Sequence, residues 1–223
     1  MTSPNLELPK AQDWNNYWGL EQTQRFTRIS WSKKRILRIL QPYVMSGGRA
    51  LDAGCGSGFF SKYFCDQRMS TTALDYSQAA LDLAHAKTSG AVSLLKANLV
   101  DDQINTLIND RFDIIFTDGL LEHFSPSDQD RIIKNLTGVL NDGGVLINFV
   151  PNRWSPWELI RPMYMPGIIE DPFTLGELSD LHERNNLNVI SRGGINTVPF
   201  PFSPDALVGA FFGMLLFTIA KKR

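Results

Sequence analysis

Apolar residues along this chain gather in short runs that alternate with segments of helical spacing. Short apolar runs bounded by turn residues predict buried strands, and apolar positions three or four residues apart predict helices. Strands are expected at residues 49–53, 71–75, 92–99, 112–118 and 140–150, with helices such as 59–65 and 78–87 between them. This alternation of strand and helix predicts a parallel sheet that is covered by helices on both faces.

The segments that flank this alternation have patterns of their own. Residues 26–44 carry apolar residues at helical spacing and predict a helix that ends near a proline. Towards the C-terminus we expect a helix at 174–184 and the two last strands at 187–198 and 214–221. The apolar run 206–220 contains two glycines and is shorter than the roughly 20 residues of a membrane span. It therefore predicts a buried strand that is entered through a short turn.

The most specific chemical signal is the glycine-rich turn after the first predicted strand. Three glycines stand at alternate positions, Gly54, Gly56 and Gly58, and a helix is expected directly after them. Such a turn lets the backbone approach a ligand closely, and it points free N–H groups and the positive end of the helix at that ligand. In the dinucleotide-binding fingerprint the third glycine comes five residues after the first, a position that Phe59 occupies here.

A third glycine four residues after the first, with Leu-Asp before the turn, resembles the first motif of class I S-adenosylmethionine-dependent methyltransferases. The resemblance implies an α/β fold with a Rossmann-like, doubly wound, seven-stranded sheet in three layers. The sheet is expected to be mostly parallel, with an antiparallel last strand. The resemblance also implies S-adenosyl-L-methionine as the cofactor, and it assigns five residues of this region to cofactor binding: Asp52, Ala53, Gly54, Gly56 and Gly58.

Two further motifs of this family follow the next two predicted strands. Asp75 lies about twenty residues beyond the glycines, where nucleotide-binding folds place the acid that holds the ribose hydroxyls, and the resemblance puts Tyr76 beside the adenine. Asn98 and Leu99 stand where the family usually has Asp and an apolar residue, and an Asn carbonyl can accept the same hydrogen bond from the adenine amino group. Taken alone, Asp75 also fits a helix cap and Asn98 a turn residue.

The fourth and fifth predicted strands complete the set. Asp118 and Gly119 begin a loop that resembles the one that family members place beneath the sulfonium and the acceptor. A glycine turn opens the fifth strand, which is another feature of the family. A glycine-rich turn by itself is equally well explained by steric needs of the backbone. Five motifs in the right order over residues 49–150 favour the functional interpretation.

His123 and Asp118 are the candidate catalytic residues. Methyl transfer from a sulfonium is an in-line displacement, so alignment of the acceptor and exclusion of water can supply much of the catalysis. Where the acceptor must lose a proton, His123 is the candidate base, because an imidazole titrates near neutral pH. A histidine that only holds the loop is an equal alternative. Asp118 is expected to orient the sulfonium side of the cofactor or an acceptor amine, and a strand-end residue bonded to the loop is its alternative.

The segment Leu121-Glu122-His123 resembles that of ubiquinone-type O-methyltransferases. In some of these enzymes the Glu and the His hold a divalent metal together with an earlier Glu. The corresponding earlier position here is Gly119, which removes one ligand, so we predict no metal. The other two histidines, His85 and His182, have no evident partner in the sequence and are expected to be structural.

Aromatic residues outside the core predict the acceptor side. Residues 151–172 hold five prolines among large apolar residues, and they follow the fifth strand at the sheet edge where open α/β folds bind ligands. We expect this segment to form a lid over an apolar acceptor pocket, with a packed surface loop as the alternative. The residues assigned to acceptor binding are Trp14, Tyr17 and Trp18 near the N-terminus, His123, and Trp157 and Tyr164 of the lid.

The predicted organisation is an N-terminal aromatic segment at 1–24 and a single methyltransferase domain at 25–223. The domain comprises the cofactor-binding core at 47–150 and the lid insert at 151–172. A chain of 223 residues is long enough for one large core.

The formal net charge of −1 argues against nucleic acid as a partner, and a small-molecule acceptor is expected instead. The two cysteines lack metal-ligand spacing and the chain starts without a signal-peptide pattern, so we expect a cytoplasmic location. No integral membrane segment is predicted. The apolar stretch 199–204 leaves a peripheral membrane contact open.

These patterns predict methyl transfer from S-adenosylmethionine to a small, apolar or amphiphilic acceptor, with O- or C-methylation favoured over N-methylation. The main alternative is a catalytically silent scaffold or sensor that binds S-adenosylmethionine, because a fold does not by itself imply turnover. An NAD-dependent oxidoreductase is disfavoured by the glycine spacing. The sequence makes no prediction of oligomeric state.

Overall fold

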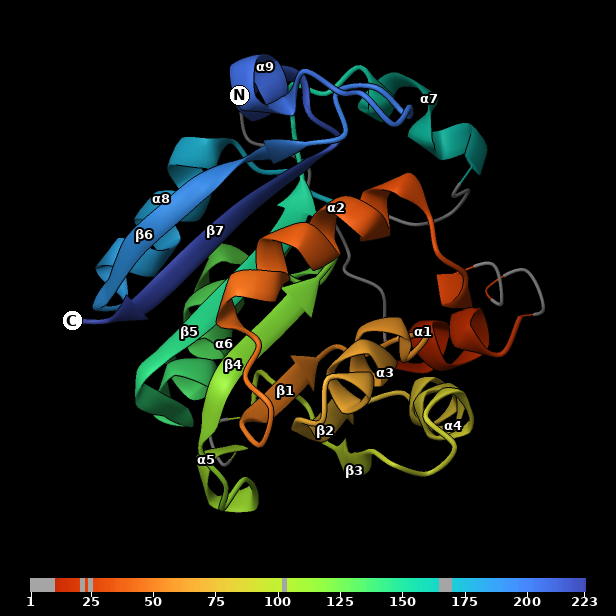
Figure 1. Ribbon diagram of the computed structural model, residues 1–223, viewed down its shortest axis with the longest axis vertical. Coiled ribbons are helices and arrows are strands. Elements are labelled where there is room, and N and C mark those ends of the chain that lie inside the picture. Colours follow the sequence, from red (N-terminus) through yellow and green to blue (C-terminus); the bar gives the residue numbers. More distant parts are fainter. Residues whose placement is uncertain (1–10, 21–22, 24–25, 102–103, 165–169) are drawn as a thin grey trace.

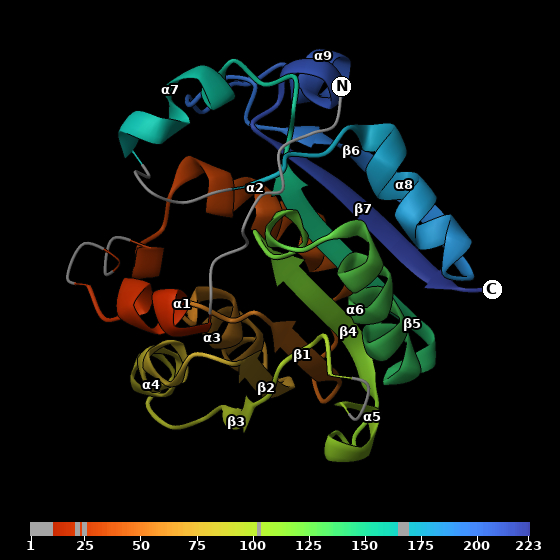
Figure 2. The same cartoon turned by 180° about the vertical axis from the view of Figure 1, so that it is seen from behind.

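The structure is a computed structural model that describes residues 11–20, 23, 26–101, 104–164 and 170–223. A seven-stranded sheet runs through the molecule, with helices on both of its faces (Figure 1, Figure 2). The strand order is β3-β2-β1-β4-β5-β7-β6. Neighbouring strands are parallel except for β7, which is antiparallel to both β5 and β6. The prediction of a doubly wound, mostly parallel sheet is confirmed.

Every predicted strand is present. The bounds are β1 (Arg49–Ala53), β2 (Ser70–Asp75), β3 (Ser93–Lys96), β4 (Phe112–Asp118), β5 (Leu140–Pro151), β6 (Leu187–Ile195) and β7 (Leu215–Lys222). β3 and β6 are each three residues shorter at their C-terminal ends than the apolar pattern predicts. The strand order reverses between β1 and β4, and open α/β sheets bind ligands in the crevice outside the strand ends at such a point.

Serine or threonine begins four of the helices. Ser30, Ser77, Ser125 and Thr174 each accept a hydrogen bond from the backbone N–H three residues on. The helices of the described residues are α1 (Ala11–Trp18), α2 (Trp31–Leu40), α3 (Phe59–Asp66), α4 (Gln78–Lys87), α5 (Ile104–Leu107), α6 (Pro126–Gly138), α7 (Trp157–Tyr164), α8 (Leu175–Arg184) and α9 (Asp205–Phe212), with short 3₁₀ turns η2 (Gln41–Tyr43) and η3 (Leu121–His123). None of them is long and apolar enough to cross a membrane.

The two faces of the sheet bury separate apolar clusters. The neighbouring residues Ile114 and Ile115 of β4 belong to different clusters, because successive side chains of a strand point to opposite faces. One cluster packs under α2 and α3, and the other packs under α6 and α8. Figure 1 shows α2 and α3 in front of the sheet, and Figure 2 shows α6 and α8 on the opposite face. The three predicted layers are therefore present.

Two predictions at the flanks need correction. The predicted helix at 26–44 begins only at Trp31, after the cap at Ser30. The short turn that was predicted before β7 is instead the helix α9. The part of the run 206–220 that belongs to α9 is not buried, since Leu207 is 84% exposed. α9 packs on β6 through two glycines, because a Cβ on Gly194 or Gly209 would clash with the backbone of the other. Apolar composition alone did not distinguish a helix that packs by one edge from a buried strand.

Candidate active site

The turn after β1 needs its glycines for backbone reasons. Gly54, Gly56 and Gly58 have φ angles of 74°, 46° and 68°, in the left-handed region that side chains disfavour. The N–H of Gly54 donates to the Leu74 carbonyl at 2.8 Å, which holds the turn against β2. Gly58 packs directly on Ala84 of α4, where a Cβ would clash with the helix backbone. The turn is thus fixed by close backbone packing on both sides.

Asp75, at the end of β2, joins this turn to α4. One carboxylate oxygen accepts from the Gly56 N–H at 3.1 Å, and the other accepts from the Ser77 N–H at 2.9 Å. Burial raises the pKa of this carboxyl, and these backbone hydrogen bonds oppose the rise. The cap of α4 is Ser77, whose hydroxyl accepts from the Ala80 N–H. Asp75 therefore supports the turn, and the helix has a different cap.

Two cavities share walls beside the turn. The smaller, of about 80 Å³, and the larger, of about 500 Å³, are both lined by six residues, namely Trp14, Trp18, Gly54, Asp118, Gly119 and His123. Asp75, Tyr76, Asn98 and Leu99 line the smaller cavity alone, as expected for residues at one nucleoside. Asp52, Gly56, Tyr17 and Trp157 line the larger cavity alone.

Two predicted site residues do not join these walls, and the side chain of a third lies outside the described residues. Ala53 is fully buried in the core, and Gly58 serves the packing of α3 on α4. Tyr164 lies at the end of α7, and its side chain is outside the described residues. Asn98 lines the smaller cavity and also accepts a hydrogen bond from the Val100 N–H at 3.1 Å, so it has both the predicted position and the turn role.

The aromatic N-terminal segment forms a wall of the site because α1 is attached to α4. Asn15 accepts hydrogen bonds from the Ser77 hydroxyl at 3.2 Å and the Ala79 N–H at 3.1 Å. Trp18 lies so close over Gly56 that a Cβ there would clash with its ring. The Trp14 ring meets the His123 ring edge-on, with 4.6 Å between centroids. Sequence reasoning missed Asn15, since nothing local marks it as a helix anchor.

The segment before α2 and the first turn of α2 were also missed. Phe26, Arg28 and Lys33 line the larger cavity, and the Ser57 hydroxyl fixes the segment by donating to the Phe26 carbonyl at 3.0 Å. The Lys33 ammonium donates to the Arg28 carbonyl at 3.2 Å and lies 4.1 Å from the centroid of the Phe59 ring. Burial lowers its pKa to about 8, and the negative charge of Asp118 opposes this shift. The only sequence signal was a group of basic residues between apolar helix positions.

A buried carboxyl group, that of Asp52, stands near the end of β1, and a half-buried one, that of Asp118, stands at the end of β4. Burial raises the pKa of Asp118 to about 6, and Lys33 opposes the rise. Burial likewise raises the pKa of Asp52 to about 7, although the Ser61 hydroxyl donates to it at 2.5 Å. Both carboxyls line the larger cavity. A cationic ligand placed there would favour their ionised forms.

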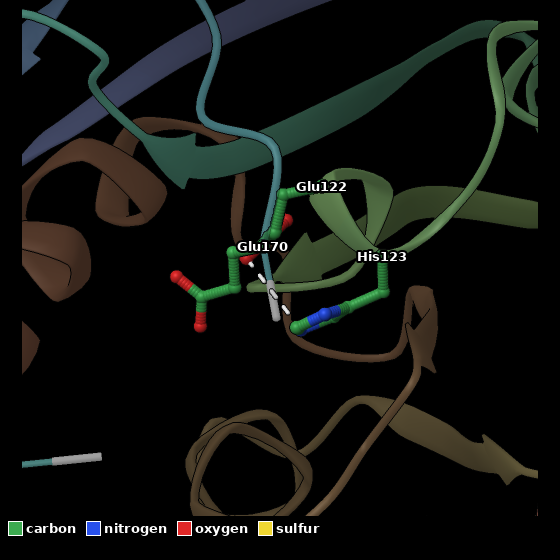
Figure 3. Close-up of side chains that lie close together, drawn as sticks. All are labelled: Glu122, His123 and Glu170. Carbon is green, nitrogen blue, oxygen red and sulfur yellow. Dashed lines mark ion pairs between the residues drawn. The ribbon is translucent and has the colours of Figure 1, made fainter. Parts of the chain in front are cut away.

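A second group with acidic residues also lines the larger cavity. Glu122 and His123 come from η3, and Glu170 comes from the segment before α8 (Figure 3). One ligand atom of each lies within 4.8 Å of the other two, and the His123 Nε2 is 3.9 Å from the Glu122 Oε1. The second oxygen of Glu122 is buried and has no hydrogen-bond partner among the residues that the structure describes.

The charges of this group are only partly balanced by Arg161 of α7. Its guanidinium lies 3.4 Å from Glu170 and 3.0 Å from Glu158. Burial, and then the nearby Glu170, raise the pKa of Glu122 well above its usual range. Burial raises the pKa of Glu170 to about 7, and Arg161 opposes this shift. The donor set of two carboxylates, one imidazole and one unsatisfied oxygen is suited to a divalent cation.

Comparison with known proteins identifies the family. Residues 50–144 match the family model described as a methyltransferase domain. This part of the chain is a methyltransferase domain. The matched residues run from β1 to β5 and contain the glycine turn and the ends of β2, β3 and β4, so the smaller cavity belongs to the methyltransferase core. The methyltransferase recognition made from the glycine spacing is confirmed, and solved structures of the same fold include methyltransferases with bound S-adenosyl-L-homocysteine.

The relatives extend this match beyond the core. A ubiquinone biosynthesis O-methyltransferase of Coxiella burnetii (strain Dugway 5J108-111) is 32% identical over 145 residues, which are 64% of this chain and 58% of that protein. The protein of the same name from Histophilus somni (strain 2336) is 31% identical over 118 residues, or 50% of this chain and 49% of that protein. The chain thus spans less than two thirds of the length of these relatives.

Solved structures share the fold over nearly the whole methyltransferase. The N-methyltransferase NodS from Bradyrhizobium japonicum WM9, in complex with S-adenosyl-L-homocysteine, has a TM-score of 0.69 and is 16% identical. The match covers 95% of this chain and 97% of that chain. At this identity the likeness establishes the fold alone, and it includes the antiparallel β6 and β7.

Proposed function

We propose that this protein transfers a methyl group from S-adenosylmethionine to a small, apolar or amphiphilic acceptor, at oxygen or carbon in preference to nitrogen. The observation that carries the proposal is the larger cavity of about 500 Å³. Its wall runs from the glycine turn, at Gly54 and Gly56, to the aromatic side chains Tyr17 and Trp157. Its size and lining suit a ring-sized or chain-bearing acceptor beside the reactive end of the cofactor. The relatives named as O-methyltransferases support oxygen as the acceptor atom.

The residues of the chain divide the work of such a transfer. S-adenosylmethionine supplies a methyl group on a positively charged sulfur. The half-buried Asp118 carboxyl, with its pKa of about 6, is ionised at neutral pH and stabilises positive charge at the boundary of the two cavities. Trp14 and Trp18 cover the same boundary and exclude water from it. The glycine turn and Asp75 fix the position of the cofactor relative to the acceptor.

We propose that His123 is the base that takes the proton from the acceptor hydroxyl. It is 7% exposed, it lines both cavities, and its Nε2 faces the carboxylate of Glu122 at 3.9 Å. The imidazolium that forms when the ring takes a proton from an acceptor hydroxyl would favour the ionised form of Glu122, against the burial that raises its pKa, and the ionised carboxylate would in turn stabilise the imidazolium. The alternative, a histidine that only holds η3, predicts that His123→Gln keeps full turnover when the fold is intact.

The first experiment separates an enzyme from a silent scaffold. Binding of S-adenosylmethionine and S-adenosylhomocysteine is measured by calorimetry, with NADH as control and Asp75→Ala as probe. Release of S-adenosylhomocysteine is then followed with a panel of phenols, quinols and prenylated quinols. Binding that Asp75→Ala weakens, together with turnover that His123→Gln abolishes, supports the proposal. Tight binding without turnover on any acceptor, with the wild-type chain and at several pH values, supports the scaffold instead.

We also propose, for the same protein, a cytoplasmic location and a peripheral contact with a membrane. The two cysteines, Cys55 and Cys65, are free, as in proteins of reducing compartments. Phe202 is 93% exposed and Leu207 is 84% exposed at the end of the molecule that carries α7 and α9 (Figure 1). A double variant, Phe202→Ser with Leu207→Ser, should lose co-sedimentation with phospholipid vesicles and keep its binding of S-adenosylhomocysteine. Equal sedimentation of variant and wild type would remove the membrane proposal.

A further inference from the structure

Glu170 is held beside η3 by the backbone around it. The N–H of Asp171 donates to the carbonyl of Glu122 at 2.9 Å. The next residues pair with the end of β5, since the Phe173 N–H donates to the Pro151 carbonyl at 3.0 Å and the Arg153 N–H donates to the Phe173 carbonyl at 2.9 Å. The side chain of Glu170 therefore enters the cavity from a fixed backbone position.

The neighbouring Glu122 has a buried carboxyl group that is only partly satisfied by hydrogen bonds and charges of the described residues. Its side chain is 1% exposed, and its Oε2 has no hydrogen-bond partner among the described residues. A buried, unpaired carboxylate oxygen is costly, and native structures usually satisfy such a group with protein, water or an ion. Figure 3 shows the Glu122 carboxylate between the side chain of Glu170 and the ring of His123. The unpaired Oε2 of Glu122 thus belongs to a cluster that also contains a second carboxylate and an imidazole, and both of these groups bind metal ions.

We propose that Glu122, His123 and Glu170 bind a divalent cation, with Glu170 as the ligand that the local sequence lacks. Protein oxygens and imidazole nitrogens lie about 2.0–2.2 Å from a cation such as Zn²⁺, so two ligands of one ion are at most about 4.4 Å apart. The 3.9 Å between His123 Nε2 and Glu122 Oε1 fits this limit. All three ligand atoms lie within 4.8 Å of one another, so no pair must approach by more than about 0.4 Å to meet this limit.

This site removes the reason for predicting no metal. That prediction rested on Gly119, where a carboxylate is missing, and the structure brings a carboxylate to the group from a distant part of the chain. All three ligands line the larger cavity, so coordination positions on the ion would face the acceptor side. Two carboxylates and one imidazole favour Mn²⁺, Mg²⁺ or Zn²⁺ over softer ions. A cation there would balance the two carboxylates, of which Arg161 now pairs with Glu170.

The inference concerns the same site as the proposed function, since a cation on the Nε2 of His123 would occupy the lone pair with which that ring takes a proton, so the base role holds for the cation-free protein. Its test uses neither cofactor nor acceptor. Chelator-treated protein is titrated with Mn²⁺, and free Mn²⁺ is measured by electron paramagnetic resonance, with Mg²⁺ and Zn²⁺ as competitors. We expect one Mn²⁺ per chain. Glu122→Gln and Glu170→Gln should each weaken binding at least tenfold, because each removes a charged ligand.

Asp171→Asn is the matched control, because Asp171 follows Glu170 in the chain but lies outside the cluster. Its side chain is 64% exposed and pairs with Arg153. Its affinity for Mn²⁺ should equal that of the wild type. Thermal unfolding without metal checks that both Gln variants fold. Failure of the wild type to bind Mn²⁺, Mg²⁺ or Zn²⁺, or an unchanged affinity in Glu170→Gln, would overturn the inference.

The two proposals fail separately. A protein that binds Mn²⁺ through Glu170 and transfers no methyl group contradicts only the proposed function. A protein that transfers methyl groups equally well after chelation and binds no cation contradicts only the metal site.

Discussion

The proposed cofactor side, around the smaller cavity, and the proposed acceptor side, around the larger one, are built in different ways. The cofactor side is formed by consecutive strand ends, from the glycine turn after β1 to Asp75 after β2 and Asn98 after β3. Its working parts are backbone groups and short polar side chains in fixed register. The acceptor side is assembled from α1, the segment before α2, η3, α7 and the residues before α8. Its working parts are large side chains from segments that are distant in the sequence.

The two sides also differ in how their buried polar groups are satisfied. On the cofactor side, both oxygens of Asp75 accept hydrogen bonds from backbone N–H groups. On the acceptor side, the Oε2 of Glu122 has no such partner among the described residues. The Asp75 carboxylate on the cofactor side is thus satisfied by the protein itself, whereas the Glu122 oxygen on the acceptor side is left for a ligand to satisfy.

The strongest test of this contrast is to add a single methyl group at Gly58, on the cofactor side. Gly58→Ala combines a φ of 68° with a clash against the backbone of Ala84, so we expect a large fall in Tm and a loss of S-adenosylhomocysteine binding of more than about a hundredfold. Gly47→Ala is the matched control, because φ is 82° there and nothing lies within 4 Å of the added Cβ. It should cost only about 1 kcal/mol. Similar losses in both variants, by calorimetry and thermal unfolding, would contradict the packing argument.

A buried network behind the acceptor side should make stability depend on pH. The His182 ring faces the Leu178 carbonyl at 2.7 Å and the Asn148 amide at 2.6 Å, and that amide bonds Thr117, the neighbour of Asp118. Burial lowers the pKa of His182 to about 4 from the 6.5 of an unperturbed histidine, so the neutral ring is the folded form.

Because the folded-state pKa lies below the unfolded value, this stability is complete above pH 6.5 and is lost as the pH falls towards 4. The shift corresponds to about 3 kcal/mol. Denaturant unfolding between pH 4 and 7.5 should show the decline in the wild type and a flatter profile in His182→Gln. Parallel profiles would mean that other groups cause the decline.

Loss of one aromatic side chain should separate the two sides. Trp157 lines only the larger cavity, so Trp157→Ala should raise the KM for the acceptor roughly tenfold and change S-adenosylhomocysteine binding less than twofold. Trp18 lines both cavities and covers Gly56, so Trp18→Ala should impair both. Kinetics and calorimetry on the two variants measure the split. A joint loss in Trp157→Ala would show that the sides are not independent.

The smallest expected effect concerns charge at the boundary of the cavities. With a pKa of about 6, Asp118 becomes neutral as the pH falls below 6, and the affinity for the positively charged cofactor should fall severalfold between pH 7.5 and 5. Asp118→Asn should bind more weakly at pH 7.5 and show little further change at pH 5. Calorimetry at the two pH values compares them. A wild-type affinity that stays constant would show that the carboxylate does not contact the charge.

The sequence by itself determined the strands of the sheet and the glycine turn of the proposed cofactor side. Left-handed φ angles at Gly54, Gly56 and Gly58 can be met at little steric cost only by glycine, and strand periodicity marks each buried strand, so these features leave local signals. Only the tertiary structure revealed α9 as a helix, Arg28 and Lys33 on the cavity wall, and Glu170 beside Glu122. Contacts between side chains that are distant in the chain impose no spacing on the sequence. They are decided by which segments the packed sheet and helices bring together, and this is why the acceptor side could be read only from the fold.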